Sequence, residues 1–315
     1  MSRAPVVSIV TATYNRSHVL RHAIHSVLDS SFTDWEMIVV GDGCTDDSAA
    51  CVDAIGDARV RFVNLPTNSG GQAAPNNHGI ELARGRYVAF LNHDDLYLRH
   101  HLASCVATLE RGESDLVWTP ALVVHDLQAA AQTGSPSFSV AGVPGTLDGR
   151  YSPFAFYIAS SWMMRRELAA RVGPWRPEKA LHVSPSQDWL FRASRTGARL
   201  TFIPHVGVLL LYAGGRPGSY AKSVSPDHDV VRRWLVEDPH CLERMLEEAA
   251  INAARQTGYE LFHNPRKAVV RGLAMPVYAL LTAIGVHPFS LNMAARHRRR
   301  GGYIRNHQRT TGARR

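Results

Sequence analysis

The sequence is poor in cysteine and lacks the motifs by which cysteine and histidine hold zinc. Only four cysteines occur in 315 residues, and none has a second cysteine at the spacing of a zinc pair. The 16 histidines are scattered, and no pair of them comes with a recognisable third ligand. We therefore expect neither a zinc site nor a disulfide framework, but free thiols in a reducing compartment.

The sequence also lacks a long apolar run. A membrane-spanning helix needs ~20 apolar residues, whereas the uncharged segment Gly272 to Val286 is shorter and is interrupted by Pro276. The apolar run Val6 to Val10 is too short for a secretory signal. We expect a cytoplasmic protein that is peripheral to the membrane. The Gly272 to Val286 segment fits either an interfacial helix or a helix docked on the body of the protein.

Acidic residues are absent from residues 261–315, which carry eleven Lys and Arg. The net charge of the whole chain is +8, but residues 1–260 hold 24 basic and 27 acidic residues, a net charge of −3. The basic character therefore belongs to the tail and indicates an anionic partner surface. Because the body is negative and has no aromatic-basic platform, we expect lipid rather than nucleic acid.

The first hundred residues alternate between strand and helix patterns. Strands are expected at four short apolar runs, and helices at His18 to Leu28 and Gln72 to Ala83. The four runs are Val6 to Ala12, Glu36 to Val40, Val60 to Asn64 and Tyr87 to Leu91. This alternation predicts an α/β fold with a mostly parallel central sheet flanked by helices.

The pattern loosens after residue 100. We expect strands at Leu116 to Val124, Leu200 to Ile203 and Val206 to Tyr212, and short helices at Arg166 to Val172 and Asp188 to Ser194. Gln128 to Pro153 is rich in Ala, Gly, Ser and Pro and is typical of a long surface loop. Asp229 to Gln256 has the pattern of an amphipathic helix, with a break near Pro239.

Polar clusters follow the predicted strands, at the edge where parallel sheets bind ligands. They are Thr11 to Asn15, Gly41 to Asp46, Asn68 to Gly71 and Asn92 to Asp95. The adjacent carboxylates Asp94 and Asp95 repel each other unless a cation or hydrogen bonds compensate. A divalent cation that holds a polyphosphate would explain them.

These clusters, in this order, resemble the inverting nucleotide-sugar glycosyltransferases of family 2, which have the GT-A fold. The resemblance covers Val6 to Tyr212 and includes Gly85 to Asp95, Ser160 to Trp175 and Gln187 to Trp189. It does not reach the basic tail. The Gln-x-x-Arg-Trp motif of the processive synthases in this family is absent, so the resemblance implies a non-processive enzyme.

The resemblance implies a donor site at the first three clusters. Ala12, Thr13, Tyr14 and Asp42 would hold the nucleotide base and ribose, and the Asp42 carboxylate would accept from the imide N–H of uracil. Gly70 and Gly71 would admit a phosphate close to the backbone, and Asn77 would hydrogen-bond the donor. Without the resemblance, Asp42 is a turn or helix-capping residue, and the Gly pair a simple turn. Asn76 stands where many members have Arg.

The metal motif of the family, Asp-x-Asp, reads Asn92-His93-Asp94 in this chain. Asp94 matches the usual metal ligand, so the resemblance implies Mg²⁺ or Mn²⁺ held by Asp94 and the donor diphosphate. Asn92 brings no charge, but it can bond the ribose or a metal-bound water. His93 is a spacer or a donor contact. Asp95 is expected to cap the next helix.

The catalytic base implied by the resemblance is Asp188, since the family commonly has Glu-Asp where this chain has Gln187-Asp188. The alternative for Asp188 is a helix cap after Ser184-Pro185-Ser186. Trp162 and Trp189 would stack on the acceptor sugar, or else pack in the core. Arg216 would reach the pyrophosphate from the Gly214 to Gly218 loop.

The function expected is inverting, metal-dependent transfer of one sugar from a nucleotide diphosphate sugar, UDP-linked, to an acceptor hydroxyl. The acceptor is a lipid-linked or cell-envelope glycan, and the protein serves polysaccharide biosynthesis. We expect a catalytic domain at 1–225, with a nucleotide-binding half at 1–98 and an acceptor half at 99–225. An amphipathic helical segment at 226–260 and the membrane-contacting tail at 261–315 follow. The alternatives are a nucleotidyltransferase, against which the Gly-free Thr11 to Arg16 loop argues, and an inactive nucleotide-sugar-binding protein.

Overall fold

The computed structural model describes residues 3–125, 127–133, 137–144, 148–211, 226–263 and 275–290. Its first unit is a seven-stranded sheet in the order β10-β6-β9-β4-β1-β2-β3. The strands are β1 (Val7–Thr13), β2 (Trp35–Gly41), β3 (Val60–Asn64), β4 (Tyr87–Phe90), β6 (Leu116–Trp118), β9 (Trp162–Arg165) and β10 (Leu200–Phe202). Strand β9 runs antiparallel to β4 and β6, and the other pairs are parallel.

A second, four-stranded sheet has the order β5-β11-β7-β8. Its strands are β5 (Asp95–Tyr97), β7 (Ala121–Val124), β8 (Phe138–Ala141) and β11 (Val208–Leu211). The loop predicted over Gln128 to Pro153 is therefore wrong in part, because it contains β8 and the helix α5 (Leu127–Thr133). Strand β8 pairs antiparallel with β7, so tertiary pairing outweighs the loop-like composition of this segment.

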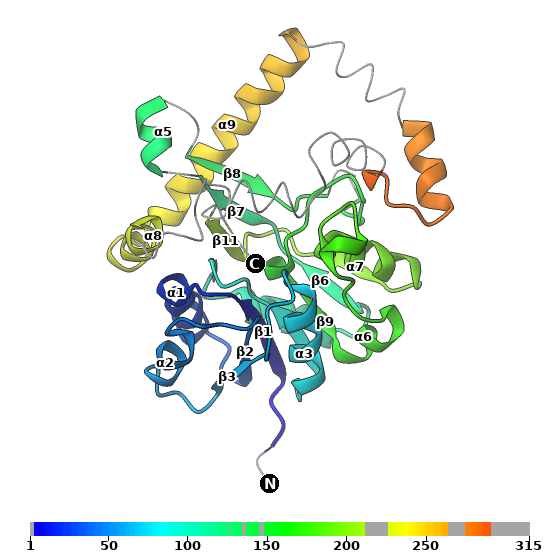
Figure 1. Cartoon of the computed structure of the whole chain (residues 1–315). Coiled ribbons are helices and arrows are strands. Elements are labelled where there is room, and N and C mark those ends of the chain that lie inside the picture. The colour runs from blue at the N-terminus through cyan, green and yellow to red at the C-terminus, as the bar shows by residue number, and fades with distance from the viewer. Residues whose placement is uncertain are drawn as a thin grey trace.

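Helices cover both faces of the large sheet. Figure 1 shows α1 and α2 on one side of it and α3, α6 and α7 on the other. The helices of the body are α1 (Ser17–Leu28), α2 (Ser48–Asp53), α3 (Ala73–Leu82), α4 (His101–Glu110), α6 (Arg166–Val172) and α7 (Pro185–Arg195), with 3-10 turns η1 (Ala159–Ser161) and η2 (Glu178–Ala180). Along β1, Val7 and Ile9 pack under α1, while Val10 joins the core on the opposite face. The expected α/β architecture is confirmed.

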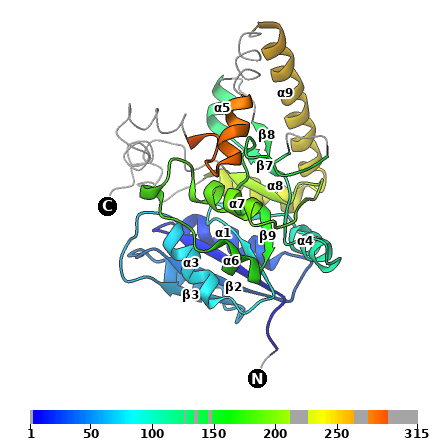
Figure 2. The ribbon, with the colours of Figure 1, turned by 90° about the vertical axis from the view of Figure 1, so that its right-hand side faces the viewer.

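The C-terminal helices are α8 (Pro226–Glu237) and α9 (Cys241–His263), with the predicted break near Pro239 between them. Val231 of α8 and Met245 of α9 pack against the smaller sheet. A further short helix covers 275–283. Figures 1 and 2 show α9 and this helix at the end of the molecule opposite the N-terminus. Among the described residues, no helix combines the length and the apolar character that crossing a membrane requires.

Three tryptophans form a stack inside the core below α7. The Trp162 ring lies 5.7 Å from that of Trp175 and 5.2 Å from that of Trp189, in nearly parallel planes. Phe90 at the end of β4 contacts both Trp162 and Trp175. Trp162 and Trp189 are fully buried. The stack therefore joins β4, β9 and α7 through packing.

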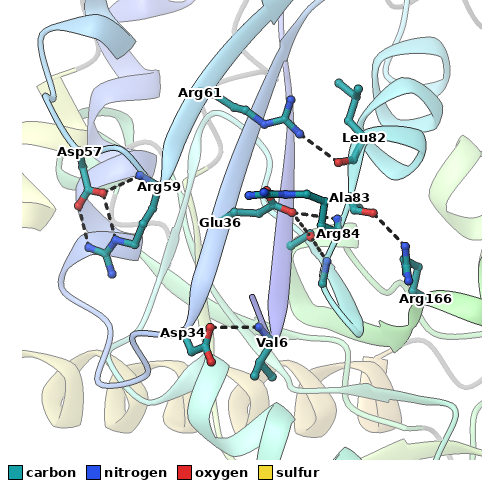
Figure 3. Close-up of polar contacts among 12 residues, drawn as sticks. Val6, Asp34, Glu36, Asp57, Arg59, Arg61, Leu82, Ala83, Arg84 and Arg166 are labelled. Atoms are coloured by element: carbon teal, nitrogen blue, oxygen red, sulfur yellow. Dashed lines mark hydrogen bonds and ion pairs between the residues drawn. The ribbon is translucent and has the colours of Figure 1, made fainter. Parts of the chain in front are cut away.

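A buried carboxylate ties the amino ends of three strands together, as Figure 3 shows. Glu36 of β2 is 4% exposed and accepts hydrogen bonds from the Ser8 hydroxyl and from the backbone and guanidinium of Arg84. The Ser8 hydroxyl in turn accepts from the N–H of Gly85. Burial alone would raise the pKa of Glu36, but the hydrogen bonds from Arg84 and Ser8 outweigh it, and the pKa is lowered.

We expect Glu36→Gln to destabilise the fold by about 1–3 kcal/mol at neutral pH, because it leaves buried groups imperfectly paired. A lowered folded-state pKa means that this stabilisation is complete above the usual pKa of 4.5 and is lost as the pH falls through the lowered value. Urea denaturation at pH 7 and at acidic pH measures both effects. Glu110→Gln, at the half-exposed partner of Arg86, is the control and should cost less than about 1 kcal/mol. An unchanged midpoint for Glu36→Gln would contradict this account.

Candidate functional site

The loops after β1 and β2 are held together at the carboxyl edge of the sheet. Asn15 has the left-handed φ of 49°, which aims its amide at the second loop. Its Oδ1 accepts from the backbone N–H of Thr45 at 2.8 Å and of Asp46 at 3.3 Å. The carbonyl of Thr13 accepts from the N–H of Asp42 at 2.8 Å. Two of the predicted donor clusters thus form one continuous surface.

Ala12 and Thr13 lie at the centre of this surface. The Ala12 carbonyl is 3.1 Å from Nδ1 of His93, so the metal motif touches the first cluster directly. The hydroxyl of Thr13 is buried and has no hydrogen-bond partner among the described residues. Tyr14 is half-buried beside it.

Asp42 anchors the third cluster. Its Oδ1 accepts from the N–H and the hydroxyl of Ser69, at 2.9 and 2.7 Å, and its Oδ2 accepts from the N–H of Gly70 at 3.2 Å. Gly70 needs its lack of a side chain, because its φ is +87°. Asp42 therefore stabilises the turn at Ser69 and Gly70, as the turn-residue alternative predicted. A carboxylate has about four acceptor positions, and these contacts use three of them.

The start of α3 holds a carboxylate that the sequence did not indicate. Glu178 of η2 accepts from the N–H of Gln72 at 2.9 Å. A Cβ on Gly71 would lie 2.0 Å from the Glu178 carboxyl group, so a larger residue at 71 would require this side chain to move. Burial raises the pKa of Glu178, and the nearby charge of Asp42 adds to this. The Gln72 N–H, which follows the glycine pair expected to admit a phosphate, is thus already bonded to a side chain of the protein itself.

Asn77 is committed to the backbone of Trp175. Its Nδ2 donates to the Trp175 carbonyl at 3.0 Å, and its Oδ1 accepts from the Trp175 N–H at 2.8 Å. This double contact fixes the segment that leads to Glu178. The structure thus gives Asn77 a role in positioning that segment.

The metal motif forms a tight turn after β4. The Asp95 carboxylate is buried and accepts from Nδ2 of Asn92 at 2.8 Å and from the hydroxyl of Ser160. The Ser160 hydroxyl also accepts from the N–H of Asn92 at 3.0 Å. Burial, reinforced by the charge of Asp94, raises the pKa of Asp95 well above its usual value. The expectation that Asp95 caps a helix is wrong, because Asp95 begins β5 and orients Asn92 instead.

Asp94 is the partly exposed carboxylate of this turn. No side chain among the described residues forms an ion pair or a hydrogen bond with its carboxylate, and no group of three potential ligands gathers there. Mg²⁺ and Mn²⁺ are often bound by one or two carboxylates together with substrate phosphates and water. Asp94 therefore fits a cation that protein and nucleotide hold jointly. Burial lowers the pKa of the neighbouring His93, which favours its neutral ring.

Asp188 lies in the first turn of α7 and is 8% exposed. Its Oδ2 accepts from Nε of Arg192 at 2.8 Å, which fixes the carboxylate. Its Oδ1 forms an ion pair with Nη1 of Arg176 at 3.6 Å, which is longer than a direct hydrogen bond. Arg192 also donates to the carbonyls of Val172 and Pro174.

A single segment, residues 157–161, connects the Asp94 turn with the start of α7. Ser160 bonds Asn92 and Asp95, while the Tyr157 carbonyl accepts from Nε2 of Gln187 at 2.5 Å. The Asp94 turn is thus hydrogen-bonded to Ser160, and Gln187 beside Asp188 is hydrogen-bonded to Tyr157, three positions earlier in the sequence. Ser160 and Gln187 lie in segments that carry the family resemblance, but neither of them was assigned this linking role from the sequence.

Two further expectations have different outcomes. Trp162 and Trp189 are fully buried in the stack described above, so the prediction that they contact an acceptor sugar is wrong and the core-packing alternative is correct. Arg216 lies outside the described residues.

Comparison with known proteins gives a family match and several relatives. A family model described as "Glycosyl transferase family 2" matches residues 8–173, just over half of the chain. The putative teichuronic acid biosynthesis glycosyltransferase TuaG of Bacillus subtilis is 41% identical over 100 residues, which cover 31% of this chain and 39% of TuaG. The UDP-Glc:alpha-D-GlcNAc-diphosphoundecaprenol beta-1,3-glucosyltransferase WfgD of Escherichia coli is 32% identical over 99 residues, covering 31% and 38%.

The fold matches a solved structure over nearly its whole length. S. aureus TarS 1-349, in complex with UDP-GlcNAc, superposes with a TM-score of 0.56 at 19% identity, over 94% of this chain and 92% of that one. This likeness concerns the fold alone. The sequence matches, by contrast, span less than two-fifths of the first curated relatives.

Proposed function

Because this chain belongs to glycosyl transferase family 2, we propose that it moves one sugar from a nucleotide diphosphate sugar to an acceptor hydroxyl with inversion at the anomeric carbon. The chain is a glycosyltransferase; the donor, the metal and the stereochemistry are the proposed parts. The observation that carries the proposal is the fastening of the Asp94 turn and of the start of α7 to one segment, residues 157–161. This connection supports our proposal that the two carboxylates belong to one site and have separate tasks in it.

In the proposed donor site, the nucleotide lies on the joined loops after β1 and β2. Ala12, Thr13, Tyr14 and Asp42 contact the base and ribose, and the bond from the Asp42 N–H to the Thr13 carbonyl, which joins the two loops, supports this. A UDP-linked donor suits the Asp42 carboxylate, since uracil offers an imide N–H. The name of the relative WfgD, which includes UDP-Glc, agrees with this choice.

The diphosphate lies towards Gly70, Gly71 and the Asn92-His93-Asp94 turn. Asp94 would hold Mg²⁺ or Mn²⁺ together with the diphosphate, and Asn92 and His93 would contact the donor. When bound, the cation stabilises the negative charge of the departing diphosphate. Glu178 is the local carboxylate that a phosphate must displace or avoid at the start of α3.

Asp188 acts as the general base. We assign proton transfer to Oδ1, because Arg192 holds Oδ2. Oδ1 takes the proton of the acceptor hydroxyl as its oxygen bonds to the anomeric carbon. The bond between that carbon and the diphosphate oxygen breaks, and the electron pair leaves with the nucleotide diphosphate. A single displacement of this kind inverts the anomeric configuration.

The proposed acceptor is a lipid-linked or cell-envelope glycan. The names of the relatives refer to teichuronic acid biosynthesis and to a diphosphoundecaprenol acceptor. We propose that residues 261–315 bring the enzyme to the anionic membrane surface where such acceptors lie, as a peripheral protein on the cytoplasmic face.

The helix at 275–283 supports this membrane contact. One side of it docks on the body, where Arg195 donates to the carbonyls of Thr282 and Ala283 and Phe154 packs on Tyr278. Four apolar side chains of this helix and of the turn after it are exposed, by 44–64%: Met275, Val277, Leu280 and Ile284. Basic residues flank it in the sequence. An apolar face within a basic, acid-free tail suits an anionic lipid surface. The helix at 275–283 can therefore dock on the body of the protein and contact the membrane interface at the same time.

We expect the double substitution Leu280→Glu with Ile284→Glu to reduce binding to anionic vesicles by at least about tenfold, since it removes apolar insertion and adds repulsion. Co-sedimentation with phosphatidylglycerol vesicles and with phosphatidylcholine vesicles measures it. Val236→Glu, at an exposed apolar position of α8 (74% exposed), is the matched control. Equal binding of wild type and double variant would refute the membrane contact.

A donor screen tests the proposed chemistry. Nucleotide sugars are compared by thermal shift with Mn²⁺ and with EDTA, and the best donor is then supplied with acceptor. We expect stabilisation by a UDP-sugar that requires Mn²⁺, and an inverted anomeric configuration in the ¹H NMR spectrum of the product. Retention of configuration would exclude the base assigned here.

A further inference from the structure

Helix α8 places a histidine against the backbone of the proposed metal turn. His228 is fully buried, and its Nε2 lies 2.8 Å from the carbonyl oxygen of Asp94. Because a carbonyl only accepts, Nε2 carries the proton of this hydrogen bond. The two residues are 134 positions apart, and α8 lies outside the part of the chain that the family model matches.

Helix α8 is fastened so that this contact is held in place. Asp229, the next residue, pairs with Arg21 of α1 at 3.1 Å. Arg232, one turn later, pairs with Asp29 at 3.1 Å. These contacts bring α8 along α1, the helix that begins directly after the Thr11 to Asn15 loop.

Hydrogen bonds from two directions hold the Asp94 turn in place. On one side, Asp95 and Ser160 hold Asn92, and the N–H of Asp95 bonds the Asn92 carbonyl at 3.1 Å. On the other side, His228 bonds the carbonyl of Asp94 itself. Fixing that carbonyl fixes the peptide plane next to the Asp94 Cα, and so the direction in which the carboxylate leaves the backbone. Partners that orient a ligand group are commonly worth 10–100-fold in metal affinity.

We propose that His228 is a positioning residue, which orients Asp94 for joint binding of a divalent cation and the nucleotide diphosphate. This inference rests on the proposed function. According to this proposal, helix α8 contributes to the donor site through the hydrogen bond of His228 with the Asp94 carbonyl. In this role His228 acts through its hydrogen bond to the Asp94 carbonyl.

Paired substitutions separate this role from simple packing. In His228→Gln the side-chain amide can still reach the Asp94 carbonyl with an N–H, whereas His228→Leu fills similar space without a donor. In His228→Asn the amide is too short to reach. His25→Leu, at an exposed position of α1, is the control. Binding of UDP is measured by calorimetry with Mn²⁺ and with EDTA.

We expect His228→Leu and His228→Asn to weaken UDP binding in Mn²⁺ by about 10–100-fold. UDP binding in EDTA should change less than about twofold, and His228→Gln should stay within about threefold of wild type. If the Leu variant does not fold, the Asn and Gln pair decides alone. Wild-type affinity in the Leu or Asn variant, or equal losses with and without Mn²⁺, would overturn the inference. A wild-type protein that binds UDP equally in Mn²⁺ and EDTA would instead refute the proposed metal site.

Discussion

Replacing Asp188 by Asn is expected to lower the kcat of sugar transfer by about 10²–10⁴-fold, the usual contribution of a general base. The reason is chemical rather than structural. The amide oxygen of Asn can still accept from Nε of Arg192, so the contact that joins α7 to residues 172–174 is kept. The amide cannot take the proton of the acceptor hydroxyl. Donor affinity should therefore remain within about twofold of wild type.

A control variant at a second arginine-paired carboxylate tests whether the loss of kcat is specific to Asp188. Asp115 pairs with Arg171 at 3.3 Å and accepts from the N–H of Arg199, and so makes contacts of the same kind. Asp115→Asn should keep full transfer activity. Initial rates over a range of acceptor concentrations, with donor affinity measured separately, give the comparison. Near-normal transfer by Asp188→Asn would remove Asp188 from the mechanism, and loss of donor binding would show that it serves the donor instead.

Replacing Asp94 by Asn should abolish the Mn²⁺-dependent part of donor binding, a loss on the order of 10³-fold. One unit of charge about 4 Å from another is worth roughly 4 kcal/mol at the effective dielectric of a protein surface, and a divalent cation increases this. Neutral Asn at 94 would leave the motif Asn-His-Asn without a charged ligand. The side-chain contacts of Asn92 and Asp95 do not involve the Asp94 carboxylate, so the turn itself should survive.

Calorimetry with UDP in Mn²⁺ and in EDTA measures this prediction. Asp53→Asn, an exposed position in α2, controls for the loss of one negative charge. The two Asp94→Asn titrations should coincide, whereas the control should keep the difference between Mn²⁺ and EDTA. A full Mn²⁺ effect in Asp94→Asn would mean that other ligands hold the cation.

The sequence predicted best those elements whose signal is local. Apolar runs followed by polar clusters located β1, β2 and β4 together with the loops that carry Asp42 and Asp94, and α6 has the predicted bounds. The break near Pro239 followed from the missing N–H of proline. The small sheet was harder to foresee, because β8 is a strand through its pairing with β7 and not through its composition.

The parts of the site that the sequence did not reveal depend on contacts between distant residues. Nothing near residue 178 indicates that Glu178 caps α3, and nothing near residue 228 indicates a bond to Asp94. Trp189 was ambiguous because a tryptophan beside a catalytic motif suits a sugar contact as well as a core. Only its burial against Trp162 decides between the two.

The most direct measurement of the division of labour between the two carboxylates is one UDP-sugar titration in Mn²⁺, run in parallel on the Asp94→Asn and Asp188→Asn variants. The account predicts that affinity falls steeply in the first and stays near wild type in the second. Equal affinities in the two variants, or the reverse order, would contradict it.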